Sequence, residues 1–117
     1  MAKFILNENQ YRLLKRTIML ESYPDKVLDI KDFLDKNYVR GEFLRNDDGK
    51  KKTIGVFVQL SDKGVPTKDS VYFDDVFYRL QKERSSILPR EDRDGFLKDV
   101  IRAWYDRKIN DRGNIVN

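Results

Sequence analysis

The residues most able to do chemistry are the carboxylates and the lysine of PDKVLDIK, residues 24–31. Pro-Asp followed by Asp-x-Lys resembles the set with which some metal-dependent nucleases hold Mg²⁺, polarise a phosphate and activate water. Those acids usually come from separate strands, whereas three residues separate Asp25 from Asp29 here. On a helix the two carboxylates would be neighbours on a solvated face, which conflicts with the geometry of a metal site. We therefore predict that Asp25, Asp29 and Lys31 do not form a catalytic centre.

The densest run of charge, RNDDGKKKT at residues 45–53, does not fit the known cation or phosphate loops. A calcium loop with Gly49 at its sixth position needs an oxygen ligand at its first position, where Leu44 stands. A phosphate-binding loop ending in Gly-Lys needs a glycine in place of Leu44 and a Ser or Thr in place of Lys51.

Two interpretations of this run remain open. Its lysines can solvate a hairpin turn and discourage edge-to-edge pairing of sheets. Alternatively, its cations can contact nucleic-acid phosphates, which gives salt-dependent affinity without sequence preference. The residues of that candidate nucleic-acid contact are Arg45, Lys50, Lys51 and Lys52.

The rest of the inventory argues against catalysis. The chain has no histidine and no cysteine, which excludes imidazole acid–base chemistry, thiolate nucleophiles, disulfides and zinc–thiolate sites. Asp74 and Asp75 are adjacent, so on a helix they diverge and are explained by the macrodipole of a first turn. In REDRDG, Arg90 and Ile101 occupy the first and twelfth positions of a calcium loop. We expect no catalytic residue, no cofactor and no metal.

The elements that position these residues begin with a short β-like run, KFIL at residues 3–6. Asn7 is a suitable N-cap for a helix, because its side-chain oxygen can accept a free backbone N–H. In the sequence that follows, helical spacing places apolar side chains on one stripe. That stripe comprises Tyr11, Leu14 and Ile18, with Leu13 and Leu20 beside it.

Pro24 separates this helix from a second one that ends near Asn37. Apolar residues at steps of three and four predict the buried face of the second helix, namely Val27, Ile30, Leu34 and Tyr38. YVRGEFLRN and KKTIGVFVQL then flank Asp-Gly, a strong hairpin signal. Strict alternation predicts that one face of the second strand is buried through Ile54, Val56, Val58 and Leu60.

The last third of the chain is predicted to be helical. SDKGVPTKD, residues 61–69, has the composition of a loop, and Asp69 or Ser70 would cap a helix with Phe73, Val76, Phe77 and Leu80 inward. After a break at residues 85–89, a final helix over residues 91–108 carries a broad apolar stripe. Its members are Phe96, Leu97, Val100, Ile101, Trp104 and Tyr105. We expect residues 109–117 to be a flexible tail.

These elements predict a single α+β domain over residues 1–117, because 117 residues with 39% hydrophobic content suffice for one core. The expected order is β-α-α-β-β-α-α, with a two- or three-stranded antiparallel sheet packed on helices. The net charge of +4 arises from mixed signs, so it permits contact with nucleic acid without requiring it. No apolar run approaches the length of a spanning helix, so we expect no membrane partner and a cytoplasmic site of synthesis.

Tyrosines on the flanking faces of the helices are candidates for a protein interface, where Tyr and Trp concentrate. An apolar pair in the polar tail could dock on a neighbouring subunit in the same way. The candidate interface residues are Tyr72, Tyr78, Tyr105, Ile115 and Val116.

The segment FILNENQYRLLKR, residues 4–16, resembles a stretch found in small proteins of tailed phages of gut Bacteroidetes. The shared features are a short β run, a polar pair, Gln-Tyr and a basic amphipathic helix. The resemblance implies a virion component of a capsid, connector or tail, and it carries no catalytic residues. The sequence thus predicts a non-enzymatic structural or adaptor protein in a homo- or hetero-oligomeric assembly. The alternative is a small nucleic-acid-binding or regulatory domain that uses the lysine-rich tip.

Overall fold

The computed structural model of the chain describes residues 7–84, 88 and 92–116. Within them, helices and a three-stranded antiparallel sheet confirm the α+β class. The predicted strand at residues 3–6 lies outside the described residues. The elements are α1 (Glu8–Ser22), α2 (Pro24–Asn37), β1 (Tyr38–Asp47), β2 (Lys50–Leu60), β3 (Pro66–Val71), α3 (Phe73–Arg84) and α4 (Arg93–Tyr105).

The predicted hairpin is confirmed, since β1 and β2 pair without interruption from Tyr38–Gln59 to Asp47–Lys50. Asp48 and Gly49 form its two-residue turn with φ of 49° and 75°. Positive φ at both positions is what the twist of a tight hairpin requires, and Asp-Gly adopts it at low cost.

A three-stranded sheet was one of the expected forms, but its third strand was not predicted at residues 66–71. Residues 66–71, expected to be loop and helix cap, form β3 and pair with β2 on the side away from β1. Asp69 and Ser70 therefore lie in a strand and do not cap α3, which begins at Phe73. Strand pairing uses backbone groups, so a polar segment can also pair. The composition of residues 66–71 therefore gave no indication of a strand.

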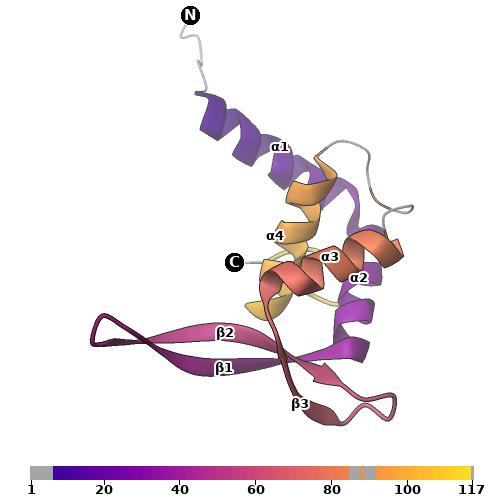
Figure 1. Cartoon of the computed structure of the whole chain (residues 1–117). Helices are drawn as coiled ribbons and strands as arrows, with labels where there is room; N and C mark the ends of the chain where they lie inside the picture. Colours follow the sequence, from indigo (N-terminus) through magenta and orange to yellow (C-terminus); the bar gives the residue numbers. More distant parts are fainter. Residues whose placement is uncertain (1–6, 85–87, 89–91, 117) are drawn as a thin grey trace, which may run out of the picture.

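The four described helices lie on one side of the sheet (Figure 1). The sheet side chain at the centre of that contact is Phe57, which is 2% exposed and stacks on Trp104 with ring centroids 5.7 Å apart. Tyr38 meets Phe57 edge to face, so both point from the sheet toward the helices. We call this side the inner face of the sheet.

The face of β2 that was predicted to be buried is therefore not the face that the helices cover. Ile54, Val56 and Val58 alternate with Phe57 and point away from the helices. Of the four residues expected to be buried, only Val56 is, at 2% exposure, and it lies outside the main hydrophobic core. The alternation of the sequence was read correctly, but it does not say which face the helices cover.

The main core is formed by the helices as predicted. In α2 and α4, the expected apolar positions are buried from Val27 to Leu34 and from Phe96 to Trp104. In α3, Val76, Phe77 and Leu80 are buried. The indole N–H of Trp104 donates to Asp35 at 2.8 Å, which satisfies the one polar group of that side chain in the core.

The segment after α4, expected to be a flexible tail, follows a defined path back toward α2. Ile109 pairs with Ile115, and the Val116 N–H donates to the Lys108 carbonyl at 2.7 Å. Gly113 closes the turn with φ of 82° against the first turn of α2, where a Cβ would lie 2.8 Å from Cγ of Leu28.

The molecule is more extended than a domain of this length needs to be. Its radius of gyration is 16.5 Å, against roughly 13 Å for a compact domain of the same length. Figure 1 shows the reason: the N-terminal part of α1 and the tip of the β1–β2 hairpin both project from the body.

Candidate interaction surfaces

The apolar stripe predicted for α1 exists, but it does not face the core. Asn7 caps the helix as predicted: its side chain accepts from the Gln10 N–H at 2.8 Å, and the Gln10 side chain accepts from the Asn7 N–H at 3.1 Å. Near the other end, Met19 is buried and Leu20 packs against the core. The capping box thus stabilises the first turn of the helix, and the last turns are anchored in the core.

Between these ends, Tyr11, Leu14 and Ile18 are 60%, 49% and 52% exposed. Their spacing of three and four residues places them on one side of the helix. We call these three residues the α1 stripe. Sequence periodicity identified its members as one stripe, but periodicity does not reveal what lies opposite.

A second apolar surface is the side of the sheet that faces away from the helices. The register places Val39, Phe43, Ile54 and Val58 on this side around the buried Val56. We call these five residues the outer sheet face. No described helix covers it (Figure 1).

The outer sheet face is well packed within itself. Phe43 meets Tyr72, which follows β3, edge to face with ring centroids 6.1 Å apart. Gly41 lies under the valines, and a Cβ there would come within 2.7 Å of a Val58 methyl. Alternation in β2 could have located this face from the sequence, but the contribution of Val39 and Phe43 was missed.

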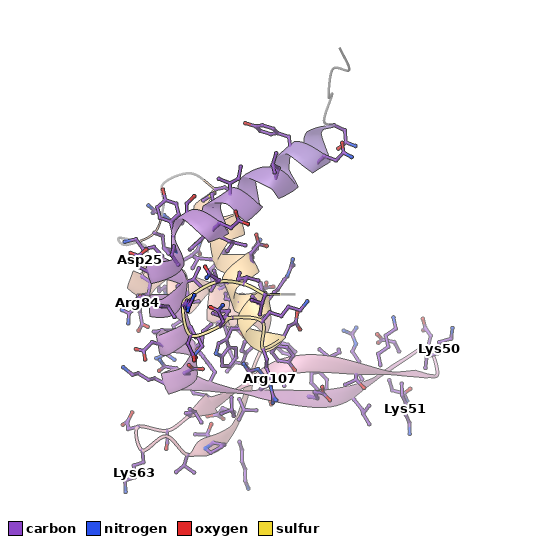
Figure 2. The ribbon with its side chains drawn as sticks, turned by 180° about the vertical axis from the view of Figure 1, so that it is seen from behind. Asp25, Lys50, Lys51, Lys63, Arg84 and Arg107 are labelled. Carbon is purple, nitrogen blue, oxygen red and sulfur yellow. The ribbon has the colours of Figure 1, made fainter. Side chains whose placement is uncertain are left out.

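The predicted basic tip lies at the far end of the hairpin. Lys50, Lys51 and Lys52 are all exposed. Lys50 and Lys51 point to opposite sides of the ribbon, so the three lysines do not form one patch (Figure 2). Arg45 pairs with Asp47 at 2.8 Å, which neutralises part of the charge of the candidate phosphate contact.

The predicted interface residues are separated in the structure. Tyr72 and Tyr78 are 55% and 61% exposed, and Val116 is 47% exposed. Tyr72 borders the outer sheet face, whereas Tyr78 lies on α3. Ile115 is half-buried by its pairing with Ile109.

Tyr105 has a role inside the chain. Its hydroxyl donates to the Gly41 carbonyl at 2.7 Å, and its ring meets Phe57 edge to face. Gly55 lies directly beneath, because a Cβ there would be 2.6 Å from the tyrosine oxygen. Burial raises the pKa of the Tyr105 hydroxyl above its ordinary value, and the negative charge of Glu42 acts in the same direction.

Arg40 fixes the end of α4 to the sheet. Its Nε donates to the carbonyls of Trp104 at 3.1 Å and Tyr105 at 2.9 Å, and its guanidinium lies 4.3 Å from the centre of the Trp104 ring. A cation at a helix C-terminus is favoured by the helix dipole. Burial lowers the pKa of Arg40, and nearby Arg107 lowers it further.

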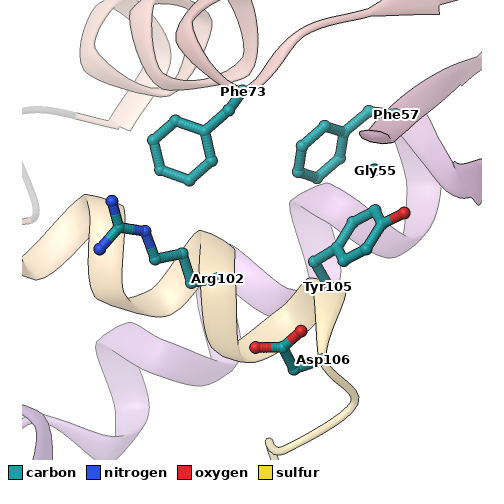
Figure 3. Close-up of a pocket in the computed structure, with 6 residues that line it drawn as sticks. All are labelled: Gly55, Phe57, Phe73, Arg102, Tyr105 and Asp106. Atoms are coloured by element: carbon teal, nitrogen blue, oxygen red, sulfur yellow. The ribbon is translucent and has the colours of Figure 1, made fainter. Parts of the chain in front are cut away.

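A small pocket of about 150 Å³ opens where the sheet meets α3 and α4 (Figure 3). Its walls are Phe57, Phe73 and Tyr105, with Arg102 lying 5.5 Å from the Phe73 ring centre. Ligand pockets commonly span about 300–1,000 Å³. The size of this pocket suits a single side chain of a partner better than a substrate.

The residues of the nuclease-like motif have structural partners on or beside α2. Lys31 pairs with Asp35 at 3.0 Å. Asp29 lies 3.2 Å from Arg84 as an ion pair, at an angle unsuited to a hydrogen bond. In the part of the chain that the structure describes, no three acidic side chains gather into a group that could hold a metal ion.

Comparison of the chain with protein-family models, with curated proteins and with solved structures gave no match. None of the described helices has the length and apolar composition to span a bilayer.

Proposed function

We propose that this chain is a non-enzymatic structural or adaptor subunit that acts through repeated protein–protein contacts. One observation carries the proposal: the α1 stripe is apolar and exposed, and within the described residues no helix or strand packs on it or on the half-buried outer sheet face. A helix stripe and a sheet face of this kind are normally buried against another element. Contiguous apolar surface at the periphery of a molecule is typical of an interaction site.

The extended shape supports the same proposal. A projecting helix and a projecting hairpin add surface to be hydrated, and they contribute little to the chain's own core. Such arms are useful when they reach a neighbouring subunit. The setting that we propose is a bacteriophage particle, in its capsid, connector or tail, because residues 4–16 resemble a segment of small phage proteins.

Size-exclusion chromatography with light scattering tests this function. We expect a mass above the 14.0 kDa of one chain that rises with protein concentration, or entry into a larger complex when the chain is purified from its natural source. A folded chain that remains monomeric at every concentration and elutes alone from that source would contradict the proposal.

A second candidate function is nucleic-acid binding through the hairpin tip. The observation that favours it is the exposure of Lys50, Lys51 and Lys52 at the start of β2, beside the turn of a projecting hairpin. Binding to duplex DNA would weaken steeply with salt, because phosphate contacts release counterions. Replacing the three lysines with glutamate should then abolish binding, and Lys63→Glu in the β2–β3 loop is a matched control.

A further inference from the structure

We infer that the polar pocket shared by Arg40 and Arg107 binds a small molecule through an oxyanion group, a phosphate or a carboxylate. The pocket lies where the end of α4 meets β1, and its walls are Arg40, Gly41, Glu42, Tyr105 and Arg107. Its volume of about 460 Å³ falls within the roughly 300–1,000 Å³ that ligand pockets commonly span. It therefore has room for a small ligand, unlike the apolar pocket of Figure 3.

Arg40 is held in a fixed orientation on the wall of this pocket. Its Nε and Nη2 donate to the last carbonyls of α4, and its guanidinium lies on the Trp104 ring. Its Nη1 makes no hydrogen bond to any described residue. An arginine that is already oriented loses little conformational entropy when its remaining donors bind an oxyanion.

Arg107 reaches the same pocket from an unfavourable backbone conformation. Its φ of 59° lies in the left-handed region that glycine usually occupies directly after a helix. A strained residue that is not glycine often has a functional role. The exposed side chain of Arg107 lines the pocket together with Arg40, where the end of α4 meets the hairpin (Figure 2). We interpret the arginine at this position as a ligand-binding residue.

The charges around the pocket leave the two arginines without a shared counterion. Burial lowers the pKa of Arg40, and Arg107 lowers it further because the two cations repel. Asp35 attracts Arg40, but it already accepts hydrogen bonds from an indole and a lysine. Glu42 is the one acidic residue on the wall, and within the described residues it forms no ion pair with either arginine. A bound oxyanion would offset the repulsion, since guanidinium groups bind phosphate and carboxylate through paired N–H donors.

Trp104 provides the measurement. It is the single tryptophan of the chain, and the Arg40 guanidinium lies 4.3 Å from its ring centre, so its fluorescence reports on the pocket. The natural chain is titrated separately with inorganic phosphate and with acetate, while sodium chloride keeps the ionic strength constant. We expect a saturable change with phosphate, which indicates a phosphorylated ligand, or with acetate, which indicates a carboxylate. Saturation by neither anion would overturn the inference.

Three glutamine variants test whether the pocket is the binding site. Arg107→Gln should weaken binding of the anion about tenfold, because one charge-assisted hydrogen bond is lost. Glu42→Gln should tighten binding, because it removes the negative charge from the wall. Lys63→Gln in the β2–β3 loop is the matched control: it removes one positive charge at another place in the molecule and should leave the affinity unchanged (Figure 2).

Two results with these variants would contradict the site. Unchanged affinity of Arg107→Gln would show that the anion binds elsewhere. An equal loss in Lys63→Gln would show that net charge alone explains the binding. Circular dichroism establishes that each variant is folded. Arg107→Gly is a second variant that also relieves the left-handed strain, so its loss of binding could not be attributed to a destabilised helix end.

Discussion

Tyr105 joins α4 to the sheet through a contact that needs one particular neighbour. Its hydroxyl reaches the Gly41 carbonyl on β1, and its ring lies over Gly55 on β2. Gly55 is required because a Cβ there would lie 2.6 Å from the tyrosine oxygen, too close for any side chain. Neither glycine lies in a turn, so the sequence alone does not explain why glycine is present at these positions. The explanation is the position of Tyr105 above the strand pair.

The first prediction concerns the pH dependence of stability. The pKa of Tyr105 is raised in the folded state, first by burial and then by Glu42, so the folded state favours the protonated hydroxyl. Its contribution is fully present below the unfolded pKa of about 10. It is lost as the pH rises from there through the folded pKa.

Urea unfolding between pH 7 and pH 11 measures this effect when the natural chain is compared with Tyr105→Phe. We expect the variant to lose about 1 kcal/mol at pH 7, since one hydrogen bond is removed. The stability difference between the two proteins should shrink above pH 10. A difference that stays constant up to pH 11 would contradict the assignment.

At the scale of elements, the end of α4 shows how a local conformation is enforced. Arg107 adopts φ of 59°, its N–H donates to Trp104 at 3.1 Å, and the Lys108 N–H donates to Ala103 at 2.8 Å. These two bonds are the pattern that ends many helices with a left-handed residue, usually glycine. Here an arginine occupies that position, beside Arg40, which already binds the last carbonyls of the helix.

The second prediction is that Arg107→Gly stabilises the chain. A left-handed non-glycine residue costs about 1–2 kcal/mol, while glycine adds about 0.5–1 kcal/mol of unfolded-state entropy. The net gain should be roughly 0.5–1 kcal/mol, measurable as a higher urea midpoint. Asp106→Gly is the control, because φ at Asp106 is −80° and glycine should destabilise there. Equal or lower stability of Arg107→Gly would contradict this account of the helix end.

The elements also show what the sequence could and could not predict. Periodicity located all four helices and the hairpin, because amphipathic spacing and the Asp-Gly turn are local signals. It missed β3, whose residues 66–71 pair through their backbone and carry few apolar side chains. It also predicted that Ile54 and Val58 are buried, whereas both are half-buried on the side away from the helices, because alternation is the same whichever face is covered. Tertiary packing determines which face of β2 the helices cover, and a short stretch of sequence does not reveal that packing.

The candidate surfaces were also only partly predictable from the sequence. Tyr11, Leu14 and Ile18 were recognised as one stripe, but their exposure depends on where α1 leaves the body of the molecule. The lysines of the tip lie at the start of β2, directly after the turn, and strand alternation directs Lys50 and Lys51 to opposite sides. The exposure of the stripe follows from the direction of a whole helix, which residue spacing does not fix.

At the scale of the whole molecule, one core joins the four described helices to the inner face of the sheet, with α1 packed on α2 and α4, and two arms extend beyond it. The extended shape costs the chain apolar burial that a more compact arrangement would recover. An assembly that covers the α1 stripe and the outer sheet face would recover that burial between copies. Apolar contacts of this kind are little affected by salt, whereas contacts through the lysine tip would weaken with it.

Sedimentation velocity of the natural chain, over a concentration series at low and high salt, is the most direct measurement of this claim. We expect the weight-average sedimentation coefficient to rise with concentration and to be as high or higher in high salt. A coefficient that stays at the value of one 14.0 kDa chain throughout the series would contradict it.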